Sequence, residues 1–124
     1  MSSSMPVVAL SLPEDPREAL QVVTEQSRET PVLVFKKSPT CPISHHAESQ
    51  FREWLTQAAG IHFAEIDVIA ERPLARGLTA ELDITHQSPQ ALLFAAGELV
   101  WHDSHMQLNV DRFHASLELA NARL

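Results

Sequence analysis

The residue with the clearest chemical potential in this sequence is Cys41, the single cysteine among 124 residues. It stands in the segment KKSPTCPISHH, directly before Pro42. Proline is favoured at the first position of a helix, so Cys41 is predicted to be the residue that caps a helix. A sulfur at that place faces free backbone N–H groups and the positive end of the helix dipole, and both stabilise a thiolate. The segment therefore predicts a reactive cysteine.

Ser44 occupies the position at which a Cys-x-x-Cys enzyme carries its second cysteine. Because serine cannot form a disulfide, a mixed disulfide on Cys41 must be resolved by a thiol from another molecule. The spacing thus predicts a monothiol exchange mechanism, with the Ser44 hydroxyl as a further hydrogen-bond donor to the sulfur. The competing interpretation is a small, inert cysteine at a helix start, since free cysteines are often simply buried.

A second unusual element is the pair Ser88–Pro89, which comes just before the apolar run ALLF. Proline cannot donate to a sheet ladder, so its place ahead of a buried strand needs an explanation. One interpretation is a cis peptide bond that leaves the backbone of Ser88 open to an incoming partner. The other is an ordinary proline at a strand start, because most X-Pro bonds are trans.

The histidines near the cysteine allow two interpretations. His45 follows Cys41 by one helical turn, and its protonated ring would favour the thiolate; the alternative is a solvated surface residue. Cys41, His45, His102 and His105 would make a chemically sensible zinc set if they converged. Their spacing is not that of a compact zinc site, however, and no metal is predicted.

The hydrophobic pattern predicts one α/β domain over residues 6–124, preceded by a flexible tail over residues 1–5. Apolar residues three and four apart indicate helices, and short β-branched runs indicate strands. The expected order is strand (7–12), helix (16–27), strand (31–36), helix (from Pro42 until Gly60), strand (61–69), helix (from Pro73), hairpin (88–105) and a helix capped by Asn109. Strand–helix alternation implies parallel strands, to which the hairpin adds an antiparallel edge. The prediction is a central mixed sheet with helices on both faces and a C-terminal hairpin plus helix.

Composition narrows the class of protein. The chain is 44% hydrophobic and 20% charged, as soluble globular domains are, and its net charge of −7 argues against nucleic acid and anionic membranes as partners. No run approaches the ~18 apolar residues of a membrane span, and the start does not resemble a signal peptide. A lone cysteine suits a reducing compartment, so we expect a cytoplasmic protein. Lys36 and Lys37 are candidates to attract an anionic thiol, although a lysine pair at a strand end is usually solvated.

Three segments, FKKSPTCPIS (35–44), HQSPQALL (86–93) and WHDSH (101–105), resemble the thioredoxin superfamily and, within it, the monothiol bacilliredoxins. The resemblance implies a thioredoxin-like fold and removal of bacillithiol from S-bacillithiolated client proteins. Bacillithiol is then a co-substrate, no cofactor is bound, and a further low-molecular-weight thiol reduces the enzyme. Cys41 is implied to be the nucleophile. The residues implied to bind substrate are those of the cysteine loop, Thr40, Pro42, Ile43 and Ser44, together with the facing Ser88 and cis Pro89.

The chain departs from the family pattern at Pro39, His45 and His46, which border the cysteine and bear on partner preference. Two other functions stay open at this point. One is a thioredoxin-like carrier of metal or an iron–sulfur cluster, or a stress-response binding module without turnover. The other is a thiol peroxidase, although no arginine stands in the cysteine loop to polarise a peroxide. A monomer or weak dimer is expected, since air oxidation would join two chains through Cys41.

Overall fold

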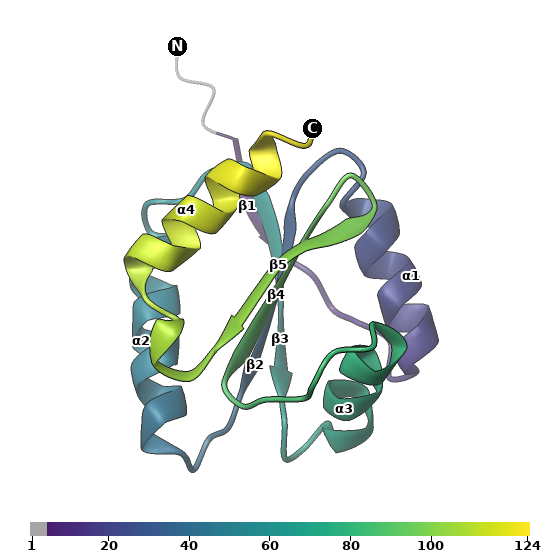
Figure 1. The fold of residues 1–124 in the computed structure, drawn as a ribbon, viewed down its shortest axis with the longest axis vertical. Coiled ribbons are helices and arrows are strands. Elements are labelled where there is room, and N and C mark those ends of the chain that lie inside the picture. Colours follow the sequence, from purple (N-terminus) through teal and green to yellow (C-terminus); the bar gives the residue numbers. More distant parts are fainter. Residues whose placement is uncertain (1–4) are drawn as a thin grey trace.

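A computed structural model describes residues 5–124 of the chain, and its helices and strands follow the expected order (Figure 1). The tail expected over residues 1–5 lies outside the described residues except for Met5, whose carbonyl oxygen accepts a hydrogen bond from the Gly60 N–H (3.2 Å). The elements are β1 (Val7–Ala9), α1 (Pro16–Gln26), β2 (Val32–Lys37), α2 (Pro42–Leu55), β3 (Ile61–Asp67), α3 (Arg72–Glu81), β4 (Gln90–Ala95), β5 (Glu98–Ser104), the short 3-10 helix η1 (His105–Gln107) and α4 (Val110–Asn121).

The five strands form one sheet in the order β1-β3-β2-β4-β5. The pairs β1/β3 and β3/β2 are parallel, whereas β4 pairs antiparallel with both β2 and β5. Helices α2 and α4 cover one face of the sheet, and α1 and α3 cover the other (Figure 1). The predicted mixed sheet with helices on both faces and a C-terminal hairpin plus helix is therefore confirmed.

Several element boundaries differ from the expected ones. The first strand ends at Ala9, although the Leu10 N–H still donates to the Phe63 carbonyl (2.7 Å), and α2 ends at Leu55 instead of extending to Gly60. The hairpin turns at Ala96–Gly97, where both residues have positive φ (55° and 78°). Two such residues give the turn the backbone twist that matches the flanking strands. The expected strand and helix are longer than the observed ones because the apolar periodicity of the sequence continues beyond the ends of the regular elements.

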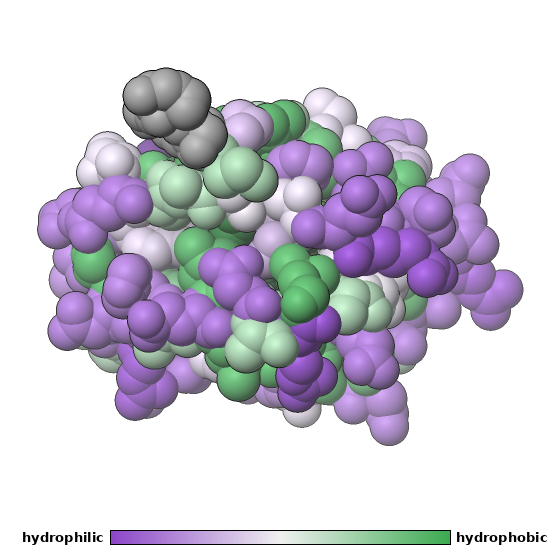
Figure 2. Space-filling model, turned by 90° about the horizontal axis from the view of Figure 1, so that it is seen from above, coloured by the Kyte–Doolittle hydropathy of each residue, from purple (hydrophilic) through white to green (hydrophobic). Residues whose placement is uncertain are grey.

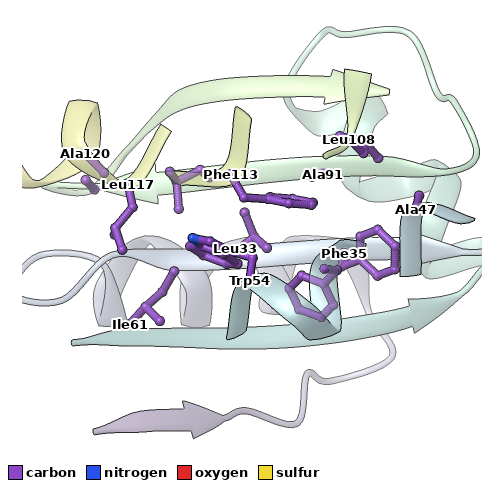
Figure 3. Packing of buried hydrophobic residues seen from close by; sticks show 13 residues of the cluster. Leu33, Phe35, Ala47, Trp54, Ile61, Ala91, Leu108, Phe113, Leu117 and Ala120 are labelled. Atoms are coloured by element: carbon purple, nitrogen blue, oxygen red, sulfur yellow. The ribbon is translucent and has the colours of Figure 1, made fainter. Parts of the chain in front are cut away.

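Strand β2 lies at the centre of the core because it is buried on both faces. Alternate residues point in opposite directions, so Leu33 and Phe35 meet α2 and α4 while Val32 and Val34 meet α1 and α3. The first of these layers is aromatic, as Figure 3 shows for Phe35, Trp54 and Phe113. Burying each such side chain stabilises the fold by about 1.5–3 kcal/mol.

Seen from the end that carries the termini, hydrophilic residues surround smaller, separated apolar patches (Figure 2). Within residues 5–124, no helix combines the length and the apolar character that crossing a membrane requires.

Gly77 interrupts the sequence pattern of α3, and the packing of α3 against α1 explains why. A Cβ atom at this position would stand 2.3 Å from Cγ and 2.8 Å from Cβ of Pro16, the first residue of α1. Real Cβ contacts are never this short, and the proline ring has little freedom to move aside. The glycine therefore permits the close approach of the two helices that cover one face of the sheet.

Gly77→Ala is expected to lower the free energy of unfolding by about 1 kcal/mol. Overpacking against Pro16 costs about 1–3 kcal/mol, which outweighs the gain of up to about 1 kcal/mol from replacing glycine in a helix. Urea unfolding measures the change. Ala80→Gly at an exposed position of the same helix gives the local glycine–alanine difference. A Gly77→Ala protein more stable than the wild type would contradict the packing argument.

Candidate active site

The central strand leads directly into the cysteine loop. After β2 ends at Lys37, four residues turn the chain, and α2 begins at Pro42 with Cys41 as its N-terminal cap in an extended conformation (φ −104°, ψ 122°). The predicted capping position of Cys41 is confirmed. The cysteine is free and half-buried. Its sulfur thus stands at the end of a rigid strand and at the positive end of a helix, where negative charge is stabilised.

The capping hydrogen bond expected for the sulfur is not formed. The side chain of Cys41 accepts no N–H from the first turn of α2. A neutral thiol is a weak acceptor, and Pro42 has no N–H to offer. The helix therefore acts on Cys41 through the field of its first turn, whose N–H groups have no partners within the helix.

Ser44 has a different role from the one expected. It is fully buried, and its hydroxyl oxygen accepts the Ser38 N–H at 2.7 Å. This bond ties the start of the cysteine loop to the first turn of α2. Its partner is therefore the loop backbone and not the sulfur of Cys41, while the assignment of Ser44 to substrate binding stays a prediction.

The outer side of the cysteine loop is exposed. Thr40, Pro42 and Ile43 all face solvent, with Ile43 41% exposed. The ring of His45 turns back over the loop, and its Nε2 lies 2.7 Å from the Pro39 carbonyl oxygen. His45 therefore braces the loop backbone, and its proposed influence on the thiol stays a prediction.

The Ser88–Pro89 peptide bond is cis, as the family resemblance implied, and the alternative of an ordinary trans proline at a strand start is wrong. Strand β4 begins one residue later at Gln90, which pairs with Lys36 near the end of β2. The antiparallel register therefore brings Ser88 and Pro89 to the sheet edge at which the cysteine loop begins. The Pro89 carbonyl accepts the His105 N–H (3.1 Å), and the buried Ser88 hydroxyl has no hydrogen-bond partner among the described residues.

Neither lysine before the loop is a freely solvated strand-end residue. Lys36 is fully buried, and its Nζ lies 2.7 Å from Nδ1 of His86 and 2.6 Å from Oε1 of Gln90. Burial, with a smaller effect of the nearby Arg76 charge, lowers the pKa of Lys36 to about 7. Lys37 is half-buried and pairs with the carboxylates of Glu48 and Glu65 at 3.2 and 3.0 Å. Its charge is thus balanced within the protein, and Lys37 is not assigned to attract an anionic thiol.

Sequence reasoning missed the buried contact of Lys36 with His86 and Gln90, although a signal was present. Lys36 continues the alternation of Val32 and Val34, so it must point to the same covered face of the sheet. Its two partners lie far along the chain, beside Ser88–Pro89. Burial and the Lys36 charge lower the pKa of His86 as well.

The zinc set considered from the sequence does not converge. Within residues 5–124, no three histidine, cysteine or acidic side chains gather closely enough to hold a metal ion. His102 lies on β5 opposite Leu92, and Nδ1 of His105 contacts the Ser104 hydroxyl oxygen at 3.0 Å. The backbone N–H of His105 instead donates to the Pro89 carbonyl oxygen and so supports the cis-proline segment.

A lone cysteine at the start of α2, set beside a cis proline on a mixed sheet, is the arrangement of a thioredoxin-fold protein. Solved structures agree. The chain is 32% identical to a protein assigned as an oxidoreductase with a thioredoxin fold (TM-score 0.72; 90% of this chain and 93% of that chain covered). The fold is shared with Fasciola hepatica thioredoxin (13% identity, TM-score 0.66, 91% and 98% covered) and Arabidopsis thaliana thioredoxin O2 (17%, 0.63, 95% and 95%).

The family follows from the sequence match. A family model described as monothiol bacilliredoxin BrxC matches residues 15–113, and the chain belongs to this family. The expected resemblance is therefore confirmed, and family and fold together give the chain a thiol–disulfide redox role as an oxidoreductase.

Ser44→Ala is expected to lower the free energy of unfolding by about 1 kcal/mol, because the Ser38 N–H loses its buried acceptor. Urea unfolding measures the loss. Thr40→Ala is the matched control, since the exposed Thr40 hydroxyl makes only a long contact (3.4 Å) with that of Ser38. Equal stability of the Ser44→Ala and Thr40→Ala proteins would show that Ser44 does not anchor the loop.

The stability of the wild-type protein is expected to rise with pH between about 7 and about 10 because of Lys36. The folded protein releases the Lys36 proton at a pKa of about 7, whereas an unfolded lysine keeps it until about 10.4. The unfolded chain therefore binds more protons in this window, so raising the pH favours the folded state. Urea unfolding at pH 7 and 9 should show a rise for the wild type that is smaller for Lys36→Met. The same rise in both proteins would contradict the lowered pKa.

Proposed function

We propose that the protein removes bacillithiol from S-bacillithiolated proteins by monothiol exchange. The observation that carries the proposal is the pairing of one half-buried, unpaired cysteine with a buried serine at the resolving position. Membership of the monothiol bacilliredoxin family supports the choice of bacillithiol over other small thiols.

The exchange proceeds in two balanced steps. The Cys41 thiolate attacks the bacillithiol sulfur of the client's mixed disulfide, a new S–S bond forms, and the client leaves as a thiolate that takes up a proton. The chain then carries bacillithiol on Cys41. A low-molecular-weight thiol, deprotonated at its sulfur, attacks the bacillithiol sulfur and forms a new S–S bond with it, and Cys41 leaves as a thiolate. An outside thiol is needed because the sequence holds no second cysteine.

The side chains around Cys41 suit a large substrate. Thr40, Pro42 and Ile43 present an exposed rim on one side of the sulfur. Ser88 and cis Pro89 lie at the same sheet edge, where the backbone before β4 offers a segment on which an extended client chain can lie. We assign substrate contact to these five residues. The buried Ser44, which the resemblance also implied to bind substrate, is assigned to loop support instead.

The partners that this mechanism needs are client proteins and a recycling thiol, both of which a reducing cytoplasm supplies. Nothing in the exchange requires a bound cofactor or a stable oligomer, so the working form is a monomer or a weak dimer. Metal carriage and peroxide reduction are the competing functions. Metal carriage gains no support from the described residues, among which no three histidine, cysteine or acidic side chains gather. Peroxide reduction gains none from the cysteine loop, whose residues 38–41 include no arginine to polarise a peroxide.

Cys41→Ser is expected to abolish bacillithiol transfer. Serine keeps the shape of the capping position but cannot form a disulfide. Intact mass spectrometry of a bacillithiolated test protein mixed with each variant shows where the adduct goes. With the wild type, the adduct mass should move from the client to this chain; with Cys41→Ser, it should stay on the client.

Parallel reactions with glutathionylated and coenzyme A-modified clients identify the preferred thiol. Faster transfer of either of these than of bacillithiol would overturn the choice of bacillithiol while keeping the exchange mechanism. If the wild type leaves all three adducts in place, monothiol exchange is wrong. Oxidation of Cys41 by peroxide without added thiol, or metal in the purified protein, would then point to a competing function.

A further inference from the structure

Lys36 is an unusual residue for the interior of a sheet. It is fully buried on the face that α1 and α3 cover, in line with Val32 and Val34. A buried amine loses hydration, and a lysine with no carboxylate partner recovers little of it. Among the described residues, Lys36 takes part in no ion pair. An apolar side chain at this position would avoid the free-energy cost of desolvating an amine. The presence of the amine is therefore best explained by the residues to which it hydrogen-bonds.

The amine joins two segments that carry the site. Its Nζ contacts His86 and Gln90, which stand on either side of Ser88–Pro89. Lys36 itself belongs to the strand that leads into the Cys41 loop. The contact therefore ties the strand of the nucleophile to the cis-proline segment, in addition to the backbone ladder between β2 and β4.

The Gln90 side chain extends this connection through the whole segment. Its Oε1 accepts from both the Lys36 amine (2.6 Å) and the Gln87 N–H (3.1 Å), and its Nε2 donates to the Thr85 carbonyl (3.0 Å). Together with the contact to the His86 ring, these hydrogen bonds connect residues 85–90 to a single atom, Nζ of Lys36. Removing that nitrogen leaves Oε1 of Gln90 and Nδ1 of His86 without their shared donor.

The protonation of the pair follows from its geometry. An ammonium group can only donate, so at 2.7 Å Nδ1 of His86 must offer a lone pair, and His86 is then neutral. The backbone of Ala75 hydrogen-bonds His86, and Arg72 and Arg76 of α3 add positive charge nearby. Lys36 therefore carries the proton of this pair, and burial together with the nearby positive charge of Arg76 favours its release as the pH rises.

The geometry points to Lys36 as a positioning residue for exchange at Cys41. Its ammonium group holds His86 and Gln90, and with them Ser88–Pro89, against the strand of the nucleophile. This inference rests on the proposed exchange function, since it concerns how a mixed disulfide is aligned for attack. Lys36 acts on the segment beside Cys41 and not on the sulfur itself.

The test compares Lys36→Met with Lys37→Met. Methionine keeps the length and volume of lysine without its donor, and Lys37 is the neighbouring lysine whose amine belongs to a surface cluster of charges. We expect Lys36→Met to slow exchange with a bacillithiolated peptide about tenfold at pH 6, equivalent to about 1.4 kcal/mol, and Lys37→Met to change it less than about threefold. Urea unfolding confirms that each variant is folded.

The pH profile separates positioning from a simple packing defect. Wild type loses the Lys36 proton above about pH 7, so the ratio of wild-type to Lys36→Met rates should shrink between pH 6 and pH 9. A packing defect would give the same ratio at every pH. Alkylation of Cys41 by iodoacetamide, which needs no aligned disulfide, should proceed at the same rate in all three proteins.

Three results would overturn the inference. They are an unchanged thiol-exchange rate in Lys36→Met, a ratio of wild-type to Lys36→Met rates that does not vary with pH, and alkylation of Cys41 slowed as much as thiol exchange, which would place the effect on the sulfur.

If the wild type reacts with no mixed disulfide, the proposed function fails, and amide hydrogen exchange then tests the role of Lys36. Faster hydrogen exchange of the Gln87 N–H in Lys36→Met than in Lys37→Met would show that Lys36 holds residues 85–90 in place. Equal protection in the two proteins would refute it.

Discussion

The antiparallel register between β2 and β4 is the constraint on which the site depends. It pairs Lys36 with Gln90, and so fixes the cysteine loop after β2 beside the cis proline before β4. A slip by one residue would turn every side chain of a strand to the opposite face. Lys36 would then point into the aromatic layer beneath α2 and α4. The register is fixed because β2 is buried on both faces, and alternate residues of the strand pack into two different hydrophobic clusters.

The aromatic layer sets the position of α2 and hence of the residue that caps it. Phe51 stacks on Phe35 of β2 (ring centroids 4.7 Å apart), and Trp54 stacks on Phe113 of α4 (5.2 Å). Helix α2 is thereby fixed to the same strand that ends at the cysteine loop. The two ends of the loop are anchored on one packed unit, so the packing of α2 on β2 fixes the place at which Cys41 is presented.

Local features of this fold could be predicted from the sequence, whereas contacts between distant segments could not. The cap at Cys41, the helices of regular spacing and the hairpin turn depend on neighbouring residues, and the cis proline was identified from its place in a resemblance. The burial of Lys36 depends instead on which strands become neighbours, because its partners arrive with β4. The support of the loop by Ser44 was missed because a serine one turn from a sulfur suggests a contact with that sulfur, while the actual partner is a backbone N–H.

Ser44 also explains why a monothiol site can keep its loop in place. A cysteine at this position would put a longer, weaker acceptor opposite the Ser38 N–H. It would also have to leave that place to attack a disulfide on Cys41. The serine hydroxyl holds the loop throughout, because it takes part in no bond that the exchange breaks. Under the proposed mechanism, the cysteine loop therefore keeps its conformation while Cys41 is in the mixed disulfide. The same exposed residues around Cys41 must then contact first the client and later the recycling thiol.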